Sequence, residues 1–429
     1  MITTCNSFIL MGVAFLVTTL AYPYVLAFAR KHRIVDNPSA RKLQRVPVPV
    51  MGGTAVFIGL VVAMAASYAI APDPRMTRVF GLLAVMYLIG VWDDVKDVSA
   101  AFRFLVELVV VWMMILTLGI EINDLHGLWG LHELPDTVSV PLSLVAGVGI
   151  MNAINLIDGV DGYCSTYGVM ACAAFGIIFY YAGDMTMFAL AMIAIGAFIP
   201  FFFHNVFGKT SKMFLGDGGS LMLGTLLAMF VFSVLSKNSP CAHYDYTNLS
   251  LPAVTLAILA VPVFDTLRVM IVRVAKGVSP FHPDKTHLHH LFIDMNFSHL
   301  STSAIIVSGN VLIEVLLLLG WMAGMSIDWQ TYLVIVLALA FTWCFYFFMD
   351  REHRKNDGDG SRLWQRWCKR GKATNLSSTP VWKFIRRVVD SKFLGAGGLK
   401  QETAEGEASV VTHVKKRRPD PRIGMKKDE

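Results

Sequence analysis

Long apolar runs dominate the sequence, and they limit it to a small set of folds. A helix that crosses a bilayer needs about 20 mostly apolar residues. Eleven runs approach or exceed that length: residues 7–29, 50–71, 77–92, 102–120, 138–154, 166–182, 185–204, 219–236, 251–272, 302–323 and 331–349. Only 16% of the residues are charged, against about 25% in a typical soluble domain. We therefore predict an all-α polytopic membrane protein, with about eleven transmembrane helices in one bundle.

Lysine and arginine are unevenly distributed over the connections between these runs. Fourteen lie in or beside the loops that follow odd-numbered runs, and three lie on the other side: Arg75, Arg78 and Lys237. Because positive residues are retained on the cytoplasmic side, the N-terminus is expected outside and the C-terminal tail in the cytoplasm. The first run lacks a basic segment before it, which predicts an anchor and not a cleaved signal peptide.

The composition changes after residue 350, so we predict a membrane domain over 1–350 and a basic cytoplasmic tail over 351–429. The tail has 20 Lys/Arg against 10 Asp/Glu. Aromatic and basic residues alternate around Trp364, Trp367 and Trp382, which is typical of amphipathic helices at a membrane surface. From about Gln401 the composition predicts disorder. Anionic lipid headgroups are the expected partner of this tail, and no nucleic-acid-binding motif accompanies it.

Five polar clusters fall on the predicted cytoplasmic side. They lie at residues 36–53, 92–97, 152–162, 214–220 and 282–290. Each cluster alone has a simple structural interpretation as a solvated loop or a helix cap. Their shared sidedness predicts a single site at the cytoplasmic membrane surface.

The carboxylates of two clusters indicate a bound cation. Asp93 and Asp94 are adjacent, and Asp97 lies one helical turn further on, so their charges repel unless a cation, basic groups or protons compensate. A Mg²⁺–diphosphate complex would do so, whereas a solvated helix end is the plainer alternative. Asp158 and Asp161 lie beside glycines in a turn that presents oxygens to water, a metal or a phosphate.

The last two clusters are suited to anions. Gly216-Asp217-Gly218-Gly219-Ser220 opens a helix, where backbone N–H groups can approach a phosphate, although Asp217 or Ser220 can also serve as an ordinary N-cap. In the last cluster, His287, His289 and His290 can donate hydrogen bonds to phosphate oxygens. A zinc site or a structural loop are the alternatives for these histidines, and the cluster lacks a nearby cysteine.

Together these motifs resemble the polyprenyl-phosphate N-acetylhexosamine-1-phosphate transferases, of the glycosyltransferase family 4 type. The matching motifs are Asp93-Asp94-x-x-Asp97, Asn152-x-x-Asn155-x-x-Asp158-Gly159-x-Asp161-Gly162, Phe214-Leu-Gly216-Asp217-x-Gly219-Ser220 and His287-x-His289-His290. The stretch Lys276-Gly-x-Ser279-Pro-Phe-x-Pro283-Asp284 before the histidines looks like the WecA-like branch. The resemblance spans about residues 8–349 and excludes the tail.

The resemblance implies a helical bundle of the inner membrane that uses Mg²⁺ or Mn²⁺. It implies transfer of N-acetylhexosamine 1-phosphate from a UDP-N-acetylhexosamine to undecaprenyl phosphate, which yields UMP and initiates a cell-surface polysaccharide such as O-antigen. The WecA-like histidine loop favours UDP-GlcNAc, and another UDP-2-acetamido sugar is the alternative. The substrates and the lipid bilayer are the expected partners, and a homodimer is one option for the assembly.

The resemblance also suggests a role for each motif residue. Asp217 is expected as the main metal ligand, with Asn155 as the second. Asp93 is expected to activate or position the lipid phosphate, with Asp94 beside it, and together with Asp217 they form the predicted catalytic set. Substrate binding is assigned to the remaining residues: Asp97, Asn152, Asp158, Asp161, His287, His289 and His290.

Two departures and two rival functions accompany this interpretation. Gln44 and Tyr163 stand where relatives often have His and Leu. Prenyltransferases also bind a diphosphate through Asp-rich motifs on membrane helices, but they do not explain the 216–220 or histidine motifs. A transporter would place its ionisable groups near the bilayer midplane, and here they lie at helix ends.

Overall fold

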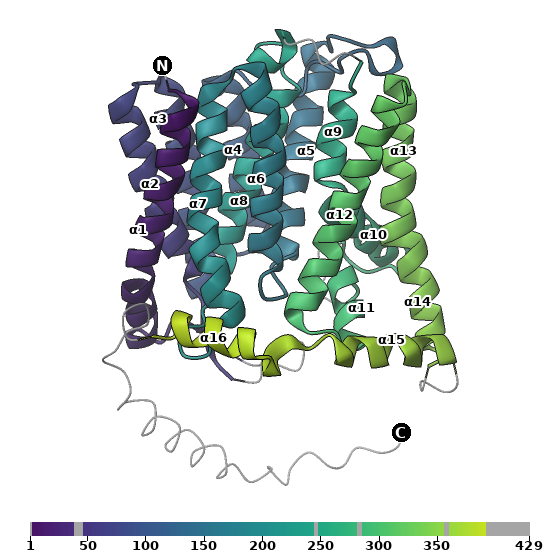
Figure 1. The fold of residues 1–429 in the computed structure, drawn as a ribbon. Helices are drawn as coiled ribbons and strands as arrows, with labels where there is room; N and C mark the ends of the chain where they lie inside the picture. The colour runs from purple at the N-terminus through teal and green to yellow at the C-terminus, as the bar shows by residue number, and fades with distance from the viewer. Residues whose placement is uncertain (1, 38–45, 244–247, 281–284, 356–359, 392–429) are drawn as a thin grey trace, which may run out of the picture.

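The computed structural model describes residues 2–37, 46–243, 248–280, 285–355 and 360–391. The predicted disordered end from Gln401, the basic Arg41, Lys42 and Arg45, Gln44, and Pro283 with Asp284 lie outside these ranges. The long helices stand side by side in one bundle (Figure 1). We call the end of the bundle that carries the last two helices the C-terminal face.

The elements follow the chain in the order of their labels. The first half contains α1 (Thr4–Lys31), β1 (Val35–Asp36), β2 (Val48–Pro49), α2 (Gly52–Ile70), α3 (Pro74–Lys96), α4 (Ala100–Leu118), α5 (Asp136–Leu156), α6 (Tyr163–Ala182) and α7 (Met185–Phe207). The second half contains α8 (Gly216–Val234), α9 (Leu251–Ile258), α10 (Ala260–Ala275), α11 (Leu288–Asp294), α12 (His299–Met322), α13 (Ile327–Leu339), the π-helical turn η3 (Ala340–Cys344), α14 (Phe345–His353), α15 (Arg362–Ala373) and α16 (Pro380–Val389).

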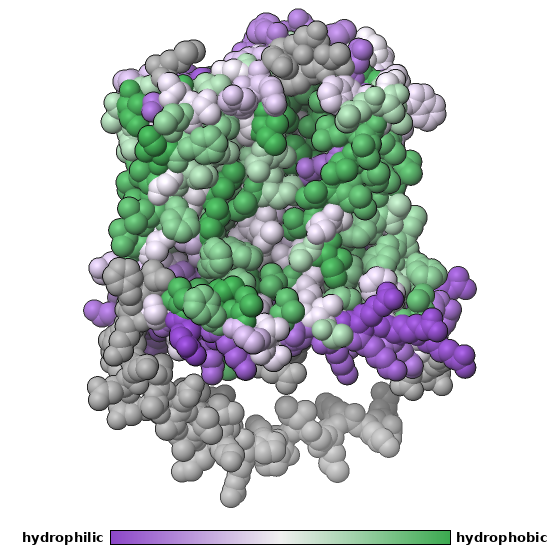
Figure 2. Space-filling view, in the orientation of Figure 1, coloured by the Kyte–Doolittle hydropathy of each residue, from purple (hydrophilic) through white to green (hydrophobic). Residues whose placement is uncertain are grey.

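The chain is an all-α polytopic membrane protein. Within the described ranges, nine helices are long and apolar enough to span a membrane, with α13 to α14 counted as one, and the bent pair α9–α10 makes a tenth. The predicted third span forms α3, which belongs to the bundle but falls outside this count. The number of spans by length and composition is therefore nine or ten, where the sequence predicted eleven. Figure 2 shows apolar side chains around the middle of the bundle and hydrophilic ones gathered along the C-terminal face.

Helix α8 forms the centre of the bundle. Its apolar window is 94% buried, and it packs against α2, α3 and α5. Glycines allow the closest approaches: a Cβ atom on Gly53 would lie 2.4 Å from the backbone nitrogen of Gly219, and one on Gly90 would lie 2.4 Å from the Asp217 carbonyl oxygen. The start of α8, which carries Asp217, is therefore fixed by backbone contacts with two neighbouring helices.

The predicted span 251–272 is broken into α9 and α10, which meet at 72°. Pro262 explains the position of the bend, because its ring clashes with the carbonyl of the residue four positions earlier, Ile258, in a straight helix. The bend frees backbone groups that lipid cannot satisfy. Asn310 of α12 supplies partners: its Oδ1 accepts from Val261 N at 3.0 Å, and its Nδ2 donates to the carbonyls of Ala257 and Ile258, each at 3.1 Å.

Two helices of the tail lie along the C-terminal face (Figure 1). Ser361 caps α15 by accepting from Trp364 N, and Thr379 caps α16 ahead of Pro380, as the preference for Ser/Thr caps and an N1 proline predicts. Trp367 of α15 packs against Phe297 and Phe345 of the bundle. The tail up to Ser391 thus contacts the membrane domain directly.

Candidate active site

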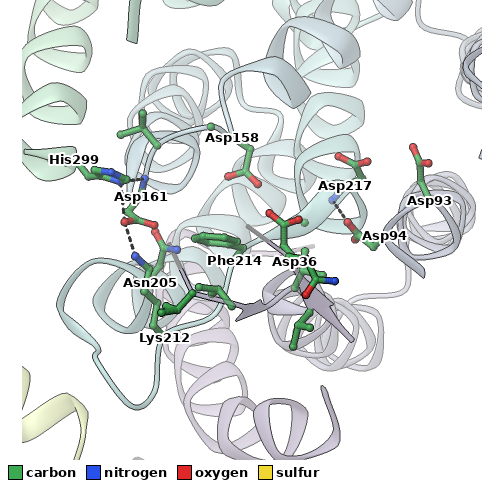
Figure 3. A pocket seen from close by; sticks show the side chains of 18 of the residues that line it. Asp36, Asp93, Asp94, Asp158, Asp161, Asn205, Lys212, Phe214, Asp217 and His299 are labelled. Carbon is green, nitrogen blue, oxygen red and sulfur yellow. Dashed lines mark hydrogen bonds and ion pairs between the residues drawn. The ribbon is translucent and has the colours of Figure 1, made fainter. Parts of the chain in front are cut away.

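A cavity of about 960 Å³ opens at the C-terminal face, and all five polar clusters contribute to it. His290 represents the histidine cluster in its walls. The other four clusters contribute seven aspartates: Asp36, Asp93, Asp94, Asp97, Asp158, Asp161 and Asp217. Figure 3 shows two groups within it. Asp93, Asp94 and Asp217 lie at one end, and Asp161, Lys212 and His299 lie at the other. Asp158 and Phe214 lie between them.

At the first end, Asp94 caps the central helix α8. Its Oδ1 accepts from Asp217 N at 2.9 Å, and its Oδ2 accepts from Gly218 N at 3.2 Å. Gly216 adopts a φ of +76°, and a Cβ atom there would lie 2.5 Å from Asp94 Oδ2. The sequence predicted that these amides approach a phosphate, or that α8 is capped by its own Asp217 or Ser220. Both interpretations are corrected, because a carboxylate from α3 already occupies the two N–H groups.

Asn155 lies directly beside Asp217. Its Nδ2 donates to Asp217 Oδ1 at 2.7 Å and contacts Ser220 Oγ at 2.9 Å. The two residues predicted as metal ligands are therefore neighbours. Ser220 in turn donates to the Gly216 carbonyl at 3.1 Å, so the side chains at this helix start form one connected network.

Arg103 of α4 joins the acidic groups at this end. Its Nη1 donates to Asp93 Oδ2 at 3.0 Å and lies 3.9 Å from Asp217 Oδ2. Its Nε lies 3.5 Å from Glu107, whose side chain is only 1% exposed. Asn152 donates to Glu107 Oε2 at 2.5 Å. Contact of Asn152 with substrate stays a prediction, and in this structure its Nδ2 is directed toward this buried carboxylate.

Asp97, the third aspartate of the Asp93-Asp94-x-x-Asp97 motif, also lines the cavity. Asp97 ends α3 in a left-handed conformation with a φ of 48°, which Asp tolerates better than most residues. Asp93 Oδ1 accepts from Val98 N at 2.8 Å, which fixes the turn after the helix. Asp93, Asp94 and Asp97 thus share one cavity, as their spacing predicted, but they face different partners.

At the second end, Asp161 is held between two basic side chains. Its Oδ2 accepts from Lys212 Nζ at 2.6 Å and lies 2.8 Å from His299 Nδ1. Burial alone would raise the pKa of Asp161, but the hydrogen bonds and charges of His299 and Lys212 outweigh it and lower that pKa. Asp161 is therefore ionised at neutral pH.

Asp158 has the opposite electrostatic environment. Burial raises its pKa well above the usual value, and the charges of Asp217, Asp94 and Asp161 raise it further. It lines the cavity between the two ends. Any cation or proton that enters this cavity is therefore attracted to the neighbourhood of Asp158, because that lowers the mutual repulsion of the aspartates.

The three predicted histidines divide into one that lines the cavity and two that lie behind it. His290 lines the cavity. His287 is 5% exposed, and its Nδ1 lies 3.0 Å from Oδ2 of Asp265 on α10. His289 is 3% exposed, and burial followed by the charges of His290 and His287 lowers its pKa and keeps it neutral. Contact of His287 and His289 with substrate stays a prediction, and in this structure both side chains are buried behind His290 of α11.

The site carries a donor set suited to one divalent cation shared with a substrate. Among the described residues, no group of three or more His, Cys, Asp or Glu is placed to enclose a metal ion. Mg²⁺ commonly takes one or two carboxylates and leaves its other positions to phosphates and water. Asp217 with the amide of Asn155, next to Asp93, fits that requirement.

Several cavity residues were not predicted as site residues from the sequence. Asp36, Lys212 and His299 line the cavity, and Arg103 organises its acidic end. In the sequence, Arg103 and Lys212 are two of the fourteen Lys and Arg residues counted in or beside the loops after odd-numbered runs. Each of these basic side chains needs an acidic partner near a helix end, but the sequence does not show which carboxylate that partner is.

The fold and the site define a class: a polytopic membrane enzyme with an aspartate-rich cavity at one face of its helical bundle. The sequence model of glycosyl transferase family 4 matches residues 76–235. The chain is 34% identical over 292 residues to a probable undecaprenyl-phosphate N-acetylglucosaminyl 1-phosphate transferase of Bacillus subtilis, covering 67% of this chain and 78% of the relative. It is 27% identical to the undecaprenyl-phosphate alpha-N-acetylglucosaminyl 1-phosphate transferase of Escherichia coli K12, covering 76% of this chain and 86% of that one.

The chain therefore belongs to glycosyl transferase family 4. This confirms the resemblance drawn from the four motifs, and with it the assignment as a membrane transferase. The matched residues 76–235 include every predicted site residue except the histidine cluster.

Proposed function

We propose that this protein transfers N-acetylglucosamine 1-phosphate from UDP-GlcNAc to undecaprenyl phosphate. The observation that carries the proposal is the two-ended cavity, in which an acidic end with Asn155 and Arg103 faces an end with Lys212 and His299. The names of the relatives support undecaprenyl phosphate as the acceptor and GlcNAc 1-phosphate as the transferred group.

In the proposed reaction, an oxygen of undecaprenyl phosphate forms a bond to the β-phosphorus of UDP-GlcNAc. The bond from that phosphorus to the bridging oxygen breaks, and UMP leaves with the electron pair. The lipid product is undecaprenyl-diphospho-N-acetylglucosamine. A phosphate is already mostly ionised near neutral pH, so the protein need not remove a proton to create the nucleophile, and its task is to bring two anions together in line.

The protein residues divide this task between the two ends. Arg103 attracts the incoming lipid phosphate and holds Asp93, whose two oxygens are already engaged by Arg103 and Val98 N. Asp93 therefore positions the nucleophile in this proposal. Asp161 and His290 form part of the nucleotide-sugar wall, where Lys212 provides positive charge and His299 an imidazole next to Asp161.

Asp217 and Asn155 would hold Mg²⁺ or Mn²⁺ together with the diphosphate of the donor. When bound, such an ion neutralises the charge that develops on the phosphate oxygens. Asp94 fixes the backbone at Asp217 through the two hydrogen bonds to the start of α8. We therefore propose that Asp94 acts as a positioning residue for Asp217.

We further propose that the C-terminal face is cytoplasmic and the N-terminus is outside, in the inner membrane. The support is the concentration of Lys and Arg in the connections on the C-terminal face. This places the cavity where soluble nucleotide-sugars are available, and it makes the product the first lipid intermediate of a cell-surface polysaccharide.

The test uses purified full-length protein in lipid nanodiscs with undecaprenyl phosphate and a panel of UDP-sugars. We expect metal-dependent release of UMP with UDP-GlcNAc. Release of UMP only with another UDP-2-acetamido sugar would change the assigned donor. Release of inorganic diphosphate from an isoprenyl diphosphate, without UMP from any UDP-sugar, would favour the prenyltransferase alternative and refute the proposal.

A further inference from the structure

The end of the tail helix α16 forms hydrogen bonds with the connection between α7 and α8, on the outside of the cavity. The carboxylate of Asp390, which follows α16, accepts three hydrogen bonds from that connection. Lys209 N donates at 3.0 Å, Ser211 N at 2.9 Å and Ser211 Oγ at 2.7 Å. These bonds lower the pKa of Asp390 even though its partial burial acts in the opposite direction. The contact joins residues that are about 180 positions apart in the chain.

Helix α16 is itself fixed on the membrane domain just before this contact. The Trp382 ring packs on Phe207, with 4.6 Å between the ring centroids. Arg386 Nε donates to the Phe207 carbonyl at 3.3 Å. Because Phe207 is the last residue of α7, the helix that carries Asp390 is anchored at the point where the α7–α8 connection begins.

The same connection is held on its other side by α1. Tyr22 Oη donates to the Ser211 carbonyl at 2.8 Å, and Arg30 donates to the Thr210 carbonyl. Residues 209–211 are therefore clamped between α1 and Asp390. Two residues further on, the Met213 carbonyl accepts from Asn205 Nδ2 at 3.0 Å.

Lys212 lies between these two fixed points. Both of its chain neighbours are tied down, so its side chain leaves the backbone in a set direction, and its Nζ reaches Asp161 Oδ2 at 2.6 Å in the cavity. Without the Asp390 carboxylate, the N–H groups of Lys209 and Ser211 lose their acceptor. The remaining hydrogen bonds from α1 reach only the carbonyl groups of this connection. The connection gains freedom at the residues that aim Lys212.

We propose that Asp390 is a positioning residue for the donor end of the cavity, acting through the α7–α8 connection to hold Lys212 on Asp161. The proposal rests on the function proposed above, because it assigns this end to the nucleotide-sugar. It gives the segment after residue 353 a part in substrate binding, although that segment lies beyond the residues matched by the family model.

The first test measures the contact without measuring activity. Hydrogen–deuterium exchange is followed in peptides covering 208–213, using the full chain in nanodiscs. In Asp390→Asn we expect exchange at Lys209 and Ser211 to rise by about tenfold or more, because hydrogen bonds to a charged acceptor are the stronger kind. Asp390→Glu, which keeps the charge, is expected to lie between Asp390→Asn and the wild type.

Asp350→Asn is the matched control. Asp350 lies near the C-terminal face and pairs with Arg354 at 2.8 Å, with no hydrogen bond to the α7–α8 connection. It should leave exchange at 208–213 unchanged. Wild-type exchange in Asp390→Asn, or equal exchange in the Asn and Glu variants, overturns the proposal.

The second test measures the kinetic consequence. Asp390→Asn should raise KM for the UDP-sugar by about three- to tenfold and change kcat by less than about twofold, since it disturbs binding more than the reacting groups. In a Lys212→Met background the same substitution should raise KM no further, because the two residues act through one path. Full additivity of the two KM effects refutes the coupling. If the wild type itself releases no UMP, the proposed function fails, while the exchange experiment still decides whether Asp390 holds the connection.

Discussion

Arg103 is the cation on which the acidic end of the cavity depends, so replacing it is the most informative perturbation. Arg103→Met keeps an unbranched apolar stem and removes the charge. Three carboxylates lose a partner: Asp93 at 3.0 Å, Glu107 at 3.5 Å and Asp217 at 3.9 Å. The effect should therefore exceed that of breaking a single surface ion pair, which contributes about 0–1 kcal/mol.

The magnitude follows from the burial of the partners. Breaking a buried pair by removing one member costs about 3–5 kcal/mol. The Arg103 side chain is 22% exposed, so water can replace part of the interaction. Asp93 and Glu107 also keep bonds to Val98 N and Asn152. We therefore expect the lower end, about 3 kcal/mol. If the whole loss fell on the transition state, kcat/KM for undecaprenyl phosphate would fall by about two orders of magnitude.

The assay combines UMP release at varied undecaprenyl phosphate with thermal unfolding of the protein in nanodiscs. Arg103→Lys, which keeps a charge but not the planar fork, should lose less than Arg103→Met. Arg78→Met is the matched control, because Arg78 lies near the start of α3, at the opposite end of that helix from Asp93, and donates to the Thr117 carbonyl. If Arg103→Met keeps both kcat/KM and Tm within the range of Arg78→Met, the reasoning about a shared counter-ion is refuted.

Three further predictions concern the metal, the bend and the ionised aspartate. Asp217→Asn should abolish metal-dependent UMP release while the protein still inserts, and near-normal activity of the purified variant would contradict the metal assignment. Asn310→Leu should destabilise the fold by about 2–6 kcal/mol, because Val261 N and the Ala257 carbonyl lose the Asn310 side chain while the Ile258 carbonyl keeps Tyr167 Oη; a Tm equal to that of the wild type would argue against the capping role. The pKa of Asp161 is lowered from 3.8 in the folded protein, so its contribution to stability is present above that value and is lost as the pH falls through the folded pKa. The decline of Tm below about pH 4 should accordingly be shallower in Asp161→Asn; identical curves would show that the Lys212–His299 environment does not stabilise the charge.

The sequence predicts the spans and the shared site because both depend on local pattern and sidedness. Apolar runs indicate which segments lie in lipid, and the numbers of Lys and Arg indicate which connections share one side of the membrane. The sequence predicts one straight span over 251–272 because this run is apolar throughout. The bend after α9 is not part of that prediction, although Pro262 indicates it. The partner that stabilises the bend, Asn310, comes from another helix and cannot be identified from the local sequence.

The sequence predictions of the site residues are limited by one physical cause. A motif gives the spacing of residues along the chain but not the direction in which each side chain points. His287, His289 and His290 look equivalent in sequence, yet only His290 lines the cavity because Asp265 holds His287 behind the wall. Asp94 looks equivalent to Asp93, yet it faces the start of α8.

The cavity also has a consequence for the order in which the protein is made. Its walls begin at Asp36, close after the first helix, and the contact that clamps the α7–α8 connection is supplied by Asp390. A ribosome adding about 5–20 residues per second needs about 20–70 s to make the chain between them. The early aspartates therefore reach the membrane surface before the helices that carry His290 and His299 have been synthesised. The finished site is thus a product of the last steps of synthesis, so a chain that stalls after α8 contains most of the acidic motifs but lacks a complete binding cavity.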